Sequence, residues 1–315
     1  MRVALALIAV LTGIIVARLG PRRAAAGGAE PRKTIFVKKN GQGFGNKVLD
    51  LIFAVYLYNY YRGACAIKYV MMDSKHERAA DPRIDSLFPL ARRKVQFVSL
   101  EHFRAFDVDK IYDYRFGRLP AARALGAHTR IENHFQDAYK MWATLSRADQ
   151  RAFTDFRPGA PAAAPPRDYA VVHVRYGDKL ADRANFALFT PEYYRARVRA
   201  YRAAGLDVVV ITDTPRAVAR LVMPEFAGDG RVAASDRRWD SDFQLMLGAK
   251  RIAMSASSFS ICASYLNPGA RCDIDLFMPA PPETLAAAPN WVITRDPKNI
   301  LNLDPAGLRE VQECA

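Results

Sequence analysis

Apolar runs of two kinds alternate along the chain after residue 33. Short, nearly continuous runs such as "YAVVHV" and "LDVVVITD" are typical of strands that are buried on both faces of a sheet. Longer amphipathic stretches lie between them. Residues 47–63 form one that ends at Gly63, and residues 191–205 form another with proline in its first turn and glycine at its end. Strands that alternate with helices predict an α/β fold with parallel sheets.

The alternation occurs twice, on either side of the proline-rich stretch "RPGAPAAAPPRD". We interpret this stretch, residues 157–168, as a linker, because it carries no large apolar side chain. The first domain is then expected over residues 34–156 and the second over 169–315. Residues 116–155 are predicted to be mostly helical. The predicted strands lie at 33–39, 65–72 and 94–100 in the first domain, and at 169–174, 206–213, 251–256 and 272–278 in the second.

The N-terminus carries a different apolar run, "VALALIAVLTGIIVA", followed by a stem rich in alanine, glycine, proline and arginine at residues 21–33. Residues 1–20 are predicted to be an uncleaved signal-anchor, which implies a single-pass protein of the Golgi or another secretory membrane with a lumenal catalytic part. A cleaved signal peptide and a transit peptide are the alternatives. More arginines follow the run than precede it, which by the positive-inside tendency favours a cytosolic bulk instead.

The composition is that of a globular protein with a basic surface. Lys and Arg exceed Asp and Glu by 46 − 32 = 14, which suits anionic partners such as a nucleotide diphosphate. The arginines are scattered along the sequence rather than clustered, so no nucleic-acid partner is expected. The four cysteines are too widely spaced for a disulfide framework or a zinc site, although one bridge is possible in an oxidising compartment.

Polar residues stand at the ends of three predicted strands of the second domain. "RYGDK" follows the first, Thr212 and Asp213 end the next, and three serines, Ser255, Ser257 and Ser258, separate a third from a helix. Ligands of open α/β sheets bind beyond the carboxyl ends of the strands. An arginine fork and a helix N-terminus both suit phosphate oxygens. The sequence therefore predicts a diphosphate site at this edge of the second sheet.

Three segments resemble the α-1,2-fucosyltransferase family, and more distantly the α-1,6- and protein O-fucosyltransferases. They are "GQGFGNKVLDLIFA", "HVRYGD" and "ASSFSICASYLNPG", in the family's order. The resemblance implies a B-type glycosyltransferase with two Rossmann-like domains, which transfers fucose from GDP-fucose to a glycan acceptor with inversion. It implies no metal and no further cofactor.

The resemblance also assigns roles to individual residues. Arg175 and Ser258 would hold the β-phosphate of GDP, with Ser257 beside them, and Arg175 would stabilise the leaving group. The remaining donor-binding residues would be His173, Asp213 and Asp242 in the second domain and Gly43, Gly45 and Asn46 in the first. Asp178 and Asp50 are candidates for the base that accepts the proton of the acceptor. The family's usual second arginine is Tyr176 here, which is expected to weaken the charge at the phosphates.

Two other functions remain open. Asp-x-Asp occurs at residues 107–109, 240–242 and 273–275, and in A-type glycosyltransferases this motif holds a metal that binds the nucleotide sugar. The chain could alternatively be a non-catalytic nucleotide- or sugar-binding relative, a hypothesis that Tyr176 keeps open. The sequence does not indicate an oligomeric state.

Overall fold

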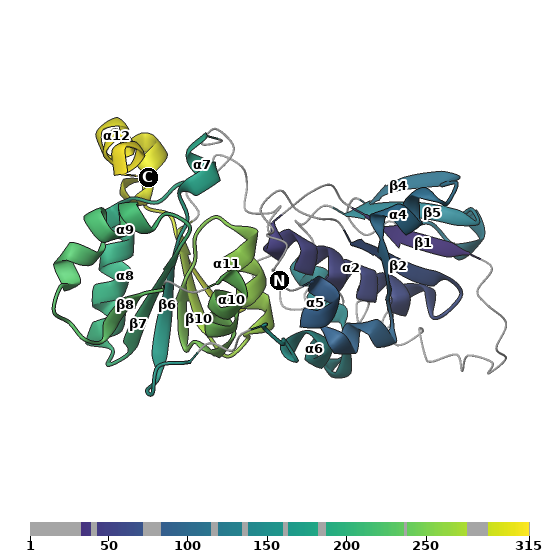
Figure 1. The fold of residues 1–315 in the computed structure, drawn as a ribbon, viewed down its shortest axis with the longest axis horizontal. Helices are drawn as coiled ribbons and strands as arrows, with labels where there is room; N and C mark the ends of the chain where they lie inside the picture. Colours follow the sequence, from purple (N-terminus) through teal and green to yellow (C-terminus); the bar gives the residue numbers. More distant parts are fainter. Residues whose placement is uncertain are drawn as a thin grey trace, which may run out of the picture.

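The computed structural model describes residues 33–38, 43–71, 83–114, 119–133, 138–159, 163–181, 187–235, 238–275 and 289–314. Its strands form two sheets, and every pair of neighbouring strands is parallel. The two sheets and their helices stand side by side as two domains (Figure 1). The predicted α/β fold with two Rossmann-like domains is confirmed.

The first sheet has the strand order β3-β2-β1-β5-β4. Alternate residues of β1 face opposite sides, so Ile35 and Val37 join the main core beneath α2, whereas Phe36 packs in a second, smaller core with Phe103 of α4. The strands are β1 (Thr34–Val37), β2 (Ala66–Met71), β3 (Gln96–Ser99), β4 (Lys110–Tyr114) and β5 (His128–Asn133). The helices are α2 (Phe44–Tyr61), α3 (Ile84–Leu87), α4 (Leu100–Arg104), α5 (Ala138–Thr144) and α6 (Arg147–Thr154), with short 3-10 helices at Pro89–Arg93 and Ala122–Ala124.

The second sheet has the order β11-β10-β9-β6-β7-β8. Helices α10 and α11 lie on the side of this sheet that faces the first domain, and α8 and α9 lie on the side away from it (Figure 1). The strands are β6 (Tyr169–Val174), β7 (Asp207–Thr212), β8 (Val232–Ala234), β9 (Arg251–Ala253), β10 (Arg271–Asp275) and β11 (Trp291–Thr294). The helices are α7 (Gly177–Ala181), α8 (Pro191–Ala203), α9 (Pro215–Leu221), α10 (Trp239–Gly248), α11 (Ser258–Leu266) and α12 (Pro305–Cys314), with 3-10 turns at Met223–Phe226, Pro297–Asn299 and Leu301–Leu303.

Every strand predicted from an apolar run is present within a few residues of its predicted bounds, but four further strands were missed. The region predicted to be mostly helical contains β5 as well as α5 and α6, and 272–278 is not the last strand, because β11 follows it. Strand β5 has the sequence "HTRIEN", which lacks an apolar run because one side of the strand carries polar side chains. Strand β8 has only three residues, too few for a periodic pattern.

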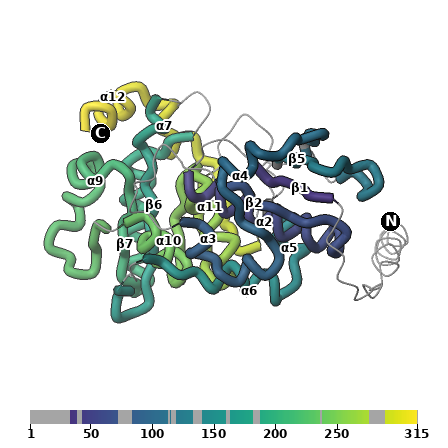
Figure 2. Tube along the Cα trace, turned by 45° about the vertical axis from the view of Figure 1, so that its right-hand side comes forward, coloured from purple at the N-terminus to yellow at the C-terminus, as the bar shows by residue number. Residues whose placement is uncertain are grey.

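The two domains meet where α2 and α11 begin. Helix α11 lies beside α2 in both the ribbon view of Figure 1 and the tube view of Figure 2. Phe44, the first residue of α2, inserts among aromatic rings of the second domain: its centroid is 4.4 Å from that of Trp239, 4.9 Å from Phe243 and 6.2 Å from Phe259. This aromatic contact places the start of the first-domain helix directly opposite the start of α11.

The predicted localisation needs correction. The structure contains, among the residues that it describes, no helix with the length and apolar character needed to cross a membrane, so single-pass anchoring is not supported. The apolar run and the stem on which that prediction rested, up to residue 32, lie outside the described residues. The possible disulfide is also absent: all four cysteines are buried with free thiols.

Candidate functional site

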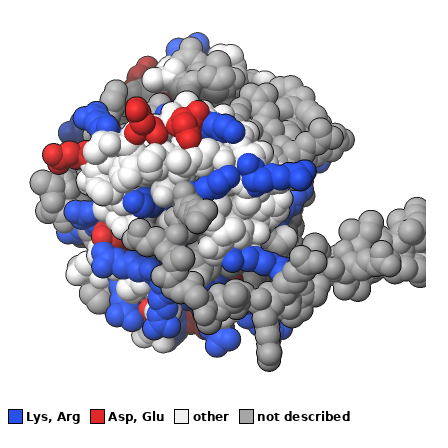
Figure 3. Space-filling model, turned by 90° about the vertical axis from the view of Figure 1, so that its right-hand side faces the viewer, with Lys and Arg blue, Asp and Glu red and all other residues white. Residues whose placement is uncertain are grey.

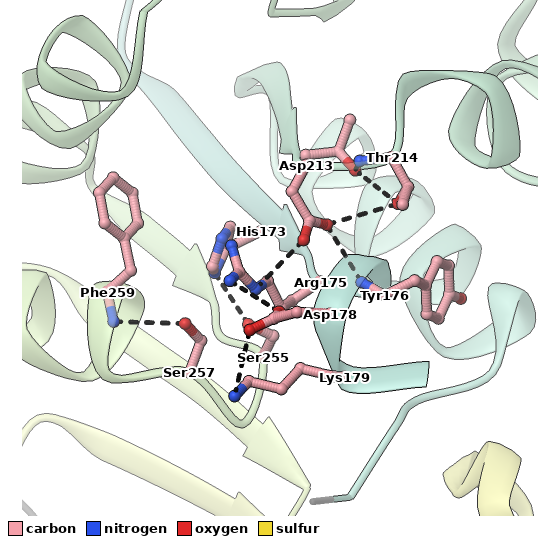
Figure 4. Close-up of polar contacts among 11 residues, drawn as sticks. His173, Arg175, Tyr176, Asp178, Lys179, Asp213, Thr214, Ser255, Ser257 and Phe259 are labelled. Atoms are coloured by element: carbon pink, nitrogen blue, oxygen red, sulfur yellow. Dashed lines mark hydrogen bonds and ion pairs between the residues drawn. The ribbon is translucent and has the colours of Figure 1, made fainter. Parts of the chain in front are cut away.

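The polar residues predicted to meet at strand ends do lie together. Strand β6 is flanked by β7 on one side and β9 on the other, so the segments after these three strands are neighbours. Arg175 follows β6, Asp213 follows β7, and Ser255 follows β9 (Figure 4). Parallel strands thereby bring three separate parts of the sequence to one edge of the sheet.

Arg175 is held between two carboxylates. One of its terminal guanidinium nitrogens donates to Oδ1 of Asp178 at 2.8 Å, and its Nε lies 3.2 Å from Oδ2 of Asp213. The Nζ of Lys179 lies 3.6 Å from the other oxygen of Asp178. The Arg175 side chain remains 29% exposed, so the guanidinium is oriented by protein contacts while part of it stays accessible to a ligand. Sequence reasoning gave Lys179 no role, although it is adjacent to Asp178.

Asp213 explains why a glycine follows the strand. A β-carbon on Gly177 would lie 2.1 Å from Oδ2 of Asp213, which is inside van der Waals contact. The other oxygen of Asp213 accepts a hydrogen bond from the backbone N–H of Tyr176 at 3.2 Å. Burial raises the pKa of Asp213, and the nearby Arg175 guanidinium opposes that shift. The absence of a side chain at Gly177 therefore makes room for the carboxylate that orients Arg175.

The Tyr176 side chain points away from Arg175 and Asp213 (Figure 4). It is fully buried, its hydroxyl donates to the carbonyl of Phe189 at 2.9 Å, and its ring packs edge-on against Tyr194. Burial raises the pKa of Tyr176 far above its ordinary value, so the phenol stays neutral. In this structure Tyr176 is therefore a core residue, and its side chain supplies nothing to the group around Arg175.

His173 is the buried link between Arg175 and α11. Its Nδ1 lies 2.8 Å from the hydroxyl oxygen of Ser255, and its ring centroid is 5.4 Å from that of Phe259. Burial, assisted by the charge of Arg175, lowers the pKa of His173 to about 3. The imidazole is consequently neutral at ordinary pH and acts in this structure as a hydrogen-bonding core residue.

The start of α11 presents its free N–H groups near these residues. The hydroxyl of Ser257 accepts from the N–H of Phe259 at 3.3 Å, so this serine serves as the N-cap. Ser260 reinforces the turn by donating to the carbonyls of Ser255 and Ser257. Ser258 is the first residue of the helix and is half-buried. Of the two serines assigned to the donor, Ser258 is therefore the one whose hydroxyl is not used by the cap.

The glycines of the first domain face this helix start. A β-carbon on Gly45 would lie 2.4 Å from the carbonyl carbon of Ser258, so the two backbones are in direct contact. Gly43 precedes α2 and accepts from the N–H of Asn46 at 3.0 Å. The positive ends of α2 and α11 consequently lie against each other, an arrangement that favours negative charge.

Asp242 belongs to the first turn of α10 and accepts a hydrogen bond from Ser235, which follows β8. The next residue, Phe243, has its ring centroid 5.2 Å from that of Phe259, which in turn lies 5.4 Å from the His173 ring. The start of α10 is therefore linked to the start of α11 and to His173 through aromatic contacts.

The Asp-x-Asp motifs are engaged in structural contacts. Asp240 accepts from the N–H of Gly159 in the predicted linker, Asp273 accepts from the Tyr201 hydroxyl, and Asp275 accepts from the Asn299 amide. Within the described part of the chain, no group of three or more His, Cys, Asp or Glu side chains could hold a metal ion.

The two candidate bases differ in accessibility. The side chain of Asp178 is 43% exposed beside Arg175, whereas Asp50 is buried within α2. A base must reach the hydroxyl from which it removes a proton. The geometry therefore favours Asp178 over Asp50.

No protein-family profile and no curated protein matches the chain. Among solved structures, E. coli heptosyltransferase WaaC with ADP is 11% identical, with a TM-score of 0.48, over 89% of this chain and 98% of that one. POFUT1 in complex with GDP is 13% identical, with a TM-score of 0.46, over 76% and 95%. The iron-containing dodecameric glycosyltransferase TibC from enterotoxigenic E. coli is 12% identical, with a TM-score of 0.45, over 85% and 64%. At these scores the likeness assigns neither a family nor a ligand to this chain.

Proposed function

We propose that the chain is an inverting, metal-independent glycosyltransferase that transfers fucose from GDP-fucose to a hydroxyl group of a glycan. One observation carries the proposal: a partly exposed, doubly held Arg175 lies close to the start of α11, where α2 also begins. The residues at this place are the ones that the three fucosyltransferase-like segments supply.

The chemistry follows from the bond that breaks. As the bond between the sugar carbon and the phosphate oxygen breaks, negative charge grows on the leaving diphosphate. Arg175 and the N–H groups at Ser258 would stabilise that charge in the transition state. The acceptor oxygen forms a new bond to the same carbon from the opposite face, and its proton passes to a base. Asp178 is the accessible carboxylate for this step.

The ion pairs of Arg175 would hold its guanidinium in the orientation that the diphosphate needs before the donor binds. In the structure its guanidinium forms ion pairs with Asp178 and Asp213. A diphosphate would accept hydrogen bonds from the guanidinium N–H groups that now face Asp178. Asp178 would then be free to accept the proton of the acceptor hydroxyl. The guanidinium would then move little on donor binding, because Asp213 remains fixed by the Tyr176 N–H.

The test is a comparison of nucleotides on the full chain. GDP and GDP-fucose should raise the melting temperature through mass action, whereas UDP-sugars should not. GDP-fucose should be hydrolysed slowly without acceptor, and the rate should survive EDTA. Stabilisation by UDP-sugars alone would contradict the donor assignment. Loss of activity in EDTA with recovery in manganese would indicate the metal-dependent alternative, and binding without hydrolysis would indicate a non-catalytic relative.

A further inference from the structure

The outer face of the first sheet, opposite α2, carries a group of cations. The register places Lys68 of β2 and Arg130 of β5 directly beside Phe36 of β1, so these three side chains share that face. Helix α4 and the segment after it pack over this face through Phe103 and Phe106. Lys68 and Arg130 nevertheless stay partly exposed.

Two lysines rest on aromatic rings of this face. The Nζ of Lys38, which follows β1, is 4.8 Å from the centroid of Phe103. The Nζ of Lys68 is 4.7 Å from the centroid of Phe106. A ring face orients an ammonium group but does not neutralise it. Both charges are thus held in place and remain available to an anion.

The two arginines add to this charge. Arg130 forms an ion pair with Glu132, but its Nε is buried and has no hydrogen-bond acceptor among the residues that the structure describes. Arg104 is exposed at the end of α4. Burial lowers the pKa of Lys38, and the charges of Arg130 and Arg104 lower it further, while Glu132 opposes them. Lys38 is therefore repelled by both arginines and attracted by Glu132.

The cluster lies at the end of the sheet that leads to the domain contact. Lys38 directly follows β1, and Gly43, five positions later in the sequence, precedes α2, whose Gly45 touches Ser258. The carboxyl end of the first sheet faces the second domain (Figure 1). Figure 3 views the first domain from the opposite end, away from the second domain, and shows Lys and Arg side chains spread over that end as well. An acceptor that approaches the donor from the first domain would meet the cations.

We propose that Lys38, Lys68, Arg104 and Arg130 bind a phosphate group carried by the acceptor glycan. This inference rests on the proposed function, because it names the class of acceptor. A phosphate monoester is a compact anion of nearly two charges with three acceptor oxygens, which matches two ammonium groups and two guanidinium groups better than one carboxylate does. A neutral acceptor would add no negative charge to the one that Glu132 supplies.

The test measures binding to the full chain saturated with GDP, so that the nucleotide occupies the donor site. Galactose 6-phosphate, galactose and inorganic phosphate are titrated by calorimetry into the parent and into the double variant Lys38→Gln/Lys68→Gln. Both lysines point outward over rings, so glutamine should leave the fold unchanged, which melting curves check. Arg216→Gln/Arg220→Gln is the matched control, because it removes two exposed charges from α9 of the second domain.

The sugar phosphate should bind the parent and the control equally and should bind the double variant about tenfold more weakly. Galactose should bind none of them measurably. Inorganic phosphate should follow the pattern of the sugar phosphate, since the four cations contact only the phosphate group. Equal binding to the double variant and the parent, or no binding of either phosphate to the parent, would overturn the inference. A parent that fails to bind GDP would instead refute the donor assignment, while a phosphate effect that depends on Lys38 and Lys68 would still stand.

Discussion

The backbone of Gly45 lies against that of Ser258, so that a single added carbon on the glycine would come within 2.4 Å of a carbonyl carbon across the domain boundary. Gly45→Ala must therefore displace main chain on one side of the contact. We expect it to destabilise the chain by about 1–3 kcal/mol, the range found when a packed core is made to hold extra atoms, and to weaken GDP binding.

Gly43→Ala is the matched control, because nothing lies within 4 Å of its added carbon. It should cost about 0.5 kcal/mol. Equal effects of the two changes in denaturant unfolding would contradict the contact.

Gly177→Ala should disturb Arg175 through Asp213. The added methyl group would occupy the place of Oδ2 of Asp213, which would turn away from the guanidinium. The effect should be smaller in an Asp213→Ala background, where the methyl group has room. A double-mutant cycle on GDP affinity should therefore give a coupling energy of about 1–3 kcal/mol. Additive losses would show that the two residues act separately.

Arg175→Ala should remove donor turnover with little change in melting temperature, because its side chain is partly exposed at the end of a strand. The expected loss is about 3 kcal/mol of transition-state stabilisation, or roughly a hundredfold in rate. Arg175→Lys should recover little of it, since an ammonium group cannot bridge Asp178 and Asp213 as the planar fork does. Arg216→Ala in the second domain serves as the control. Turnover by Arg175→Ala at the parental rate would refute the assigned role.

Position 176 should not accept the arginine that the resembled family carries there. Tyr176→Phe loses one hydrogen bond to the Phe189 carbonyl and should cost about 1 kcal/mol. Tyr176→Arg places a charge in the fully buried site of a neutral phenol and should cost about 3 kcal/mol or more. Urea unfolding of both variants provides the comparison. A stable Tyr176→Arg protein with raised turnover would show that this side chain can turn toward the crevice.

His173 should make the fold sensitive to acid. Its pKa is about 3 in the folded chain and 6.5 in the reference state, so the unfolded chain binds the extra proton between these values. Its contribution to stability is complete above pH 6.5 and falls below it, by about 1.4 kcal/mol for each pH unit at most. His173→Asn keeps a polar group near Ser255 but does not titrate. The stability difference between parent and variant should therefore shrink as the pH falls from 6.5 to 4. A constant difference would show that folding does not lower the pKa of His173.

The fold of the second domain is predicted from the sequence more completely than that of the first. Strands β6 and β7 are buried on both faces and have unbroken apolar sequences, which also locate Arg175 and Asp213 at their ends. Strand β5 carries His128 and Arg130 on its open face, so its pattern resembles a polar segment. The hydrophobic pattern of one sequence also cannot show whether the side chain of a residue that follows a strand points into the core or toward solvent. Tyr176 and Arg175 are adjacent in the sequence, yet one is fully buried and the other is partly exposed.

The position of β6 in the middle of its sheet has a consequence for synthesis on the ribosome. Strand β6 is the first strand of its sheet to be synthesised, but both of its neighbours come later in the sequence. Asp213 is made 37 residues after its partner Tyr176, and Ser255 is made 82 residues after its partner His173. Until β7 and β9 have been made, the backbone of "YAVVHV" lacks the hydrogen-bond partners that these strands provide. Such apolar strands associate readily with other chains. The nascent second domain is therefore the part of this protein for which a chaperone would matter most, and slow translation after residue 174 would lengthen the exposure.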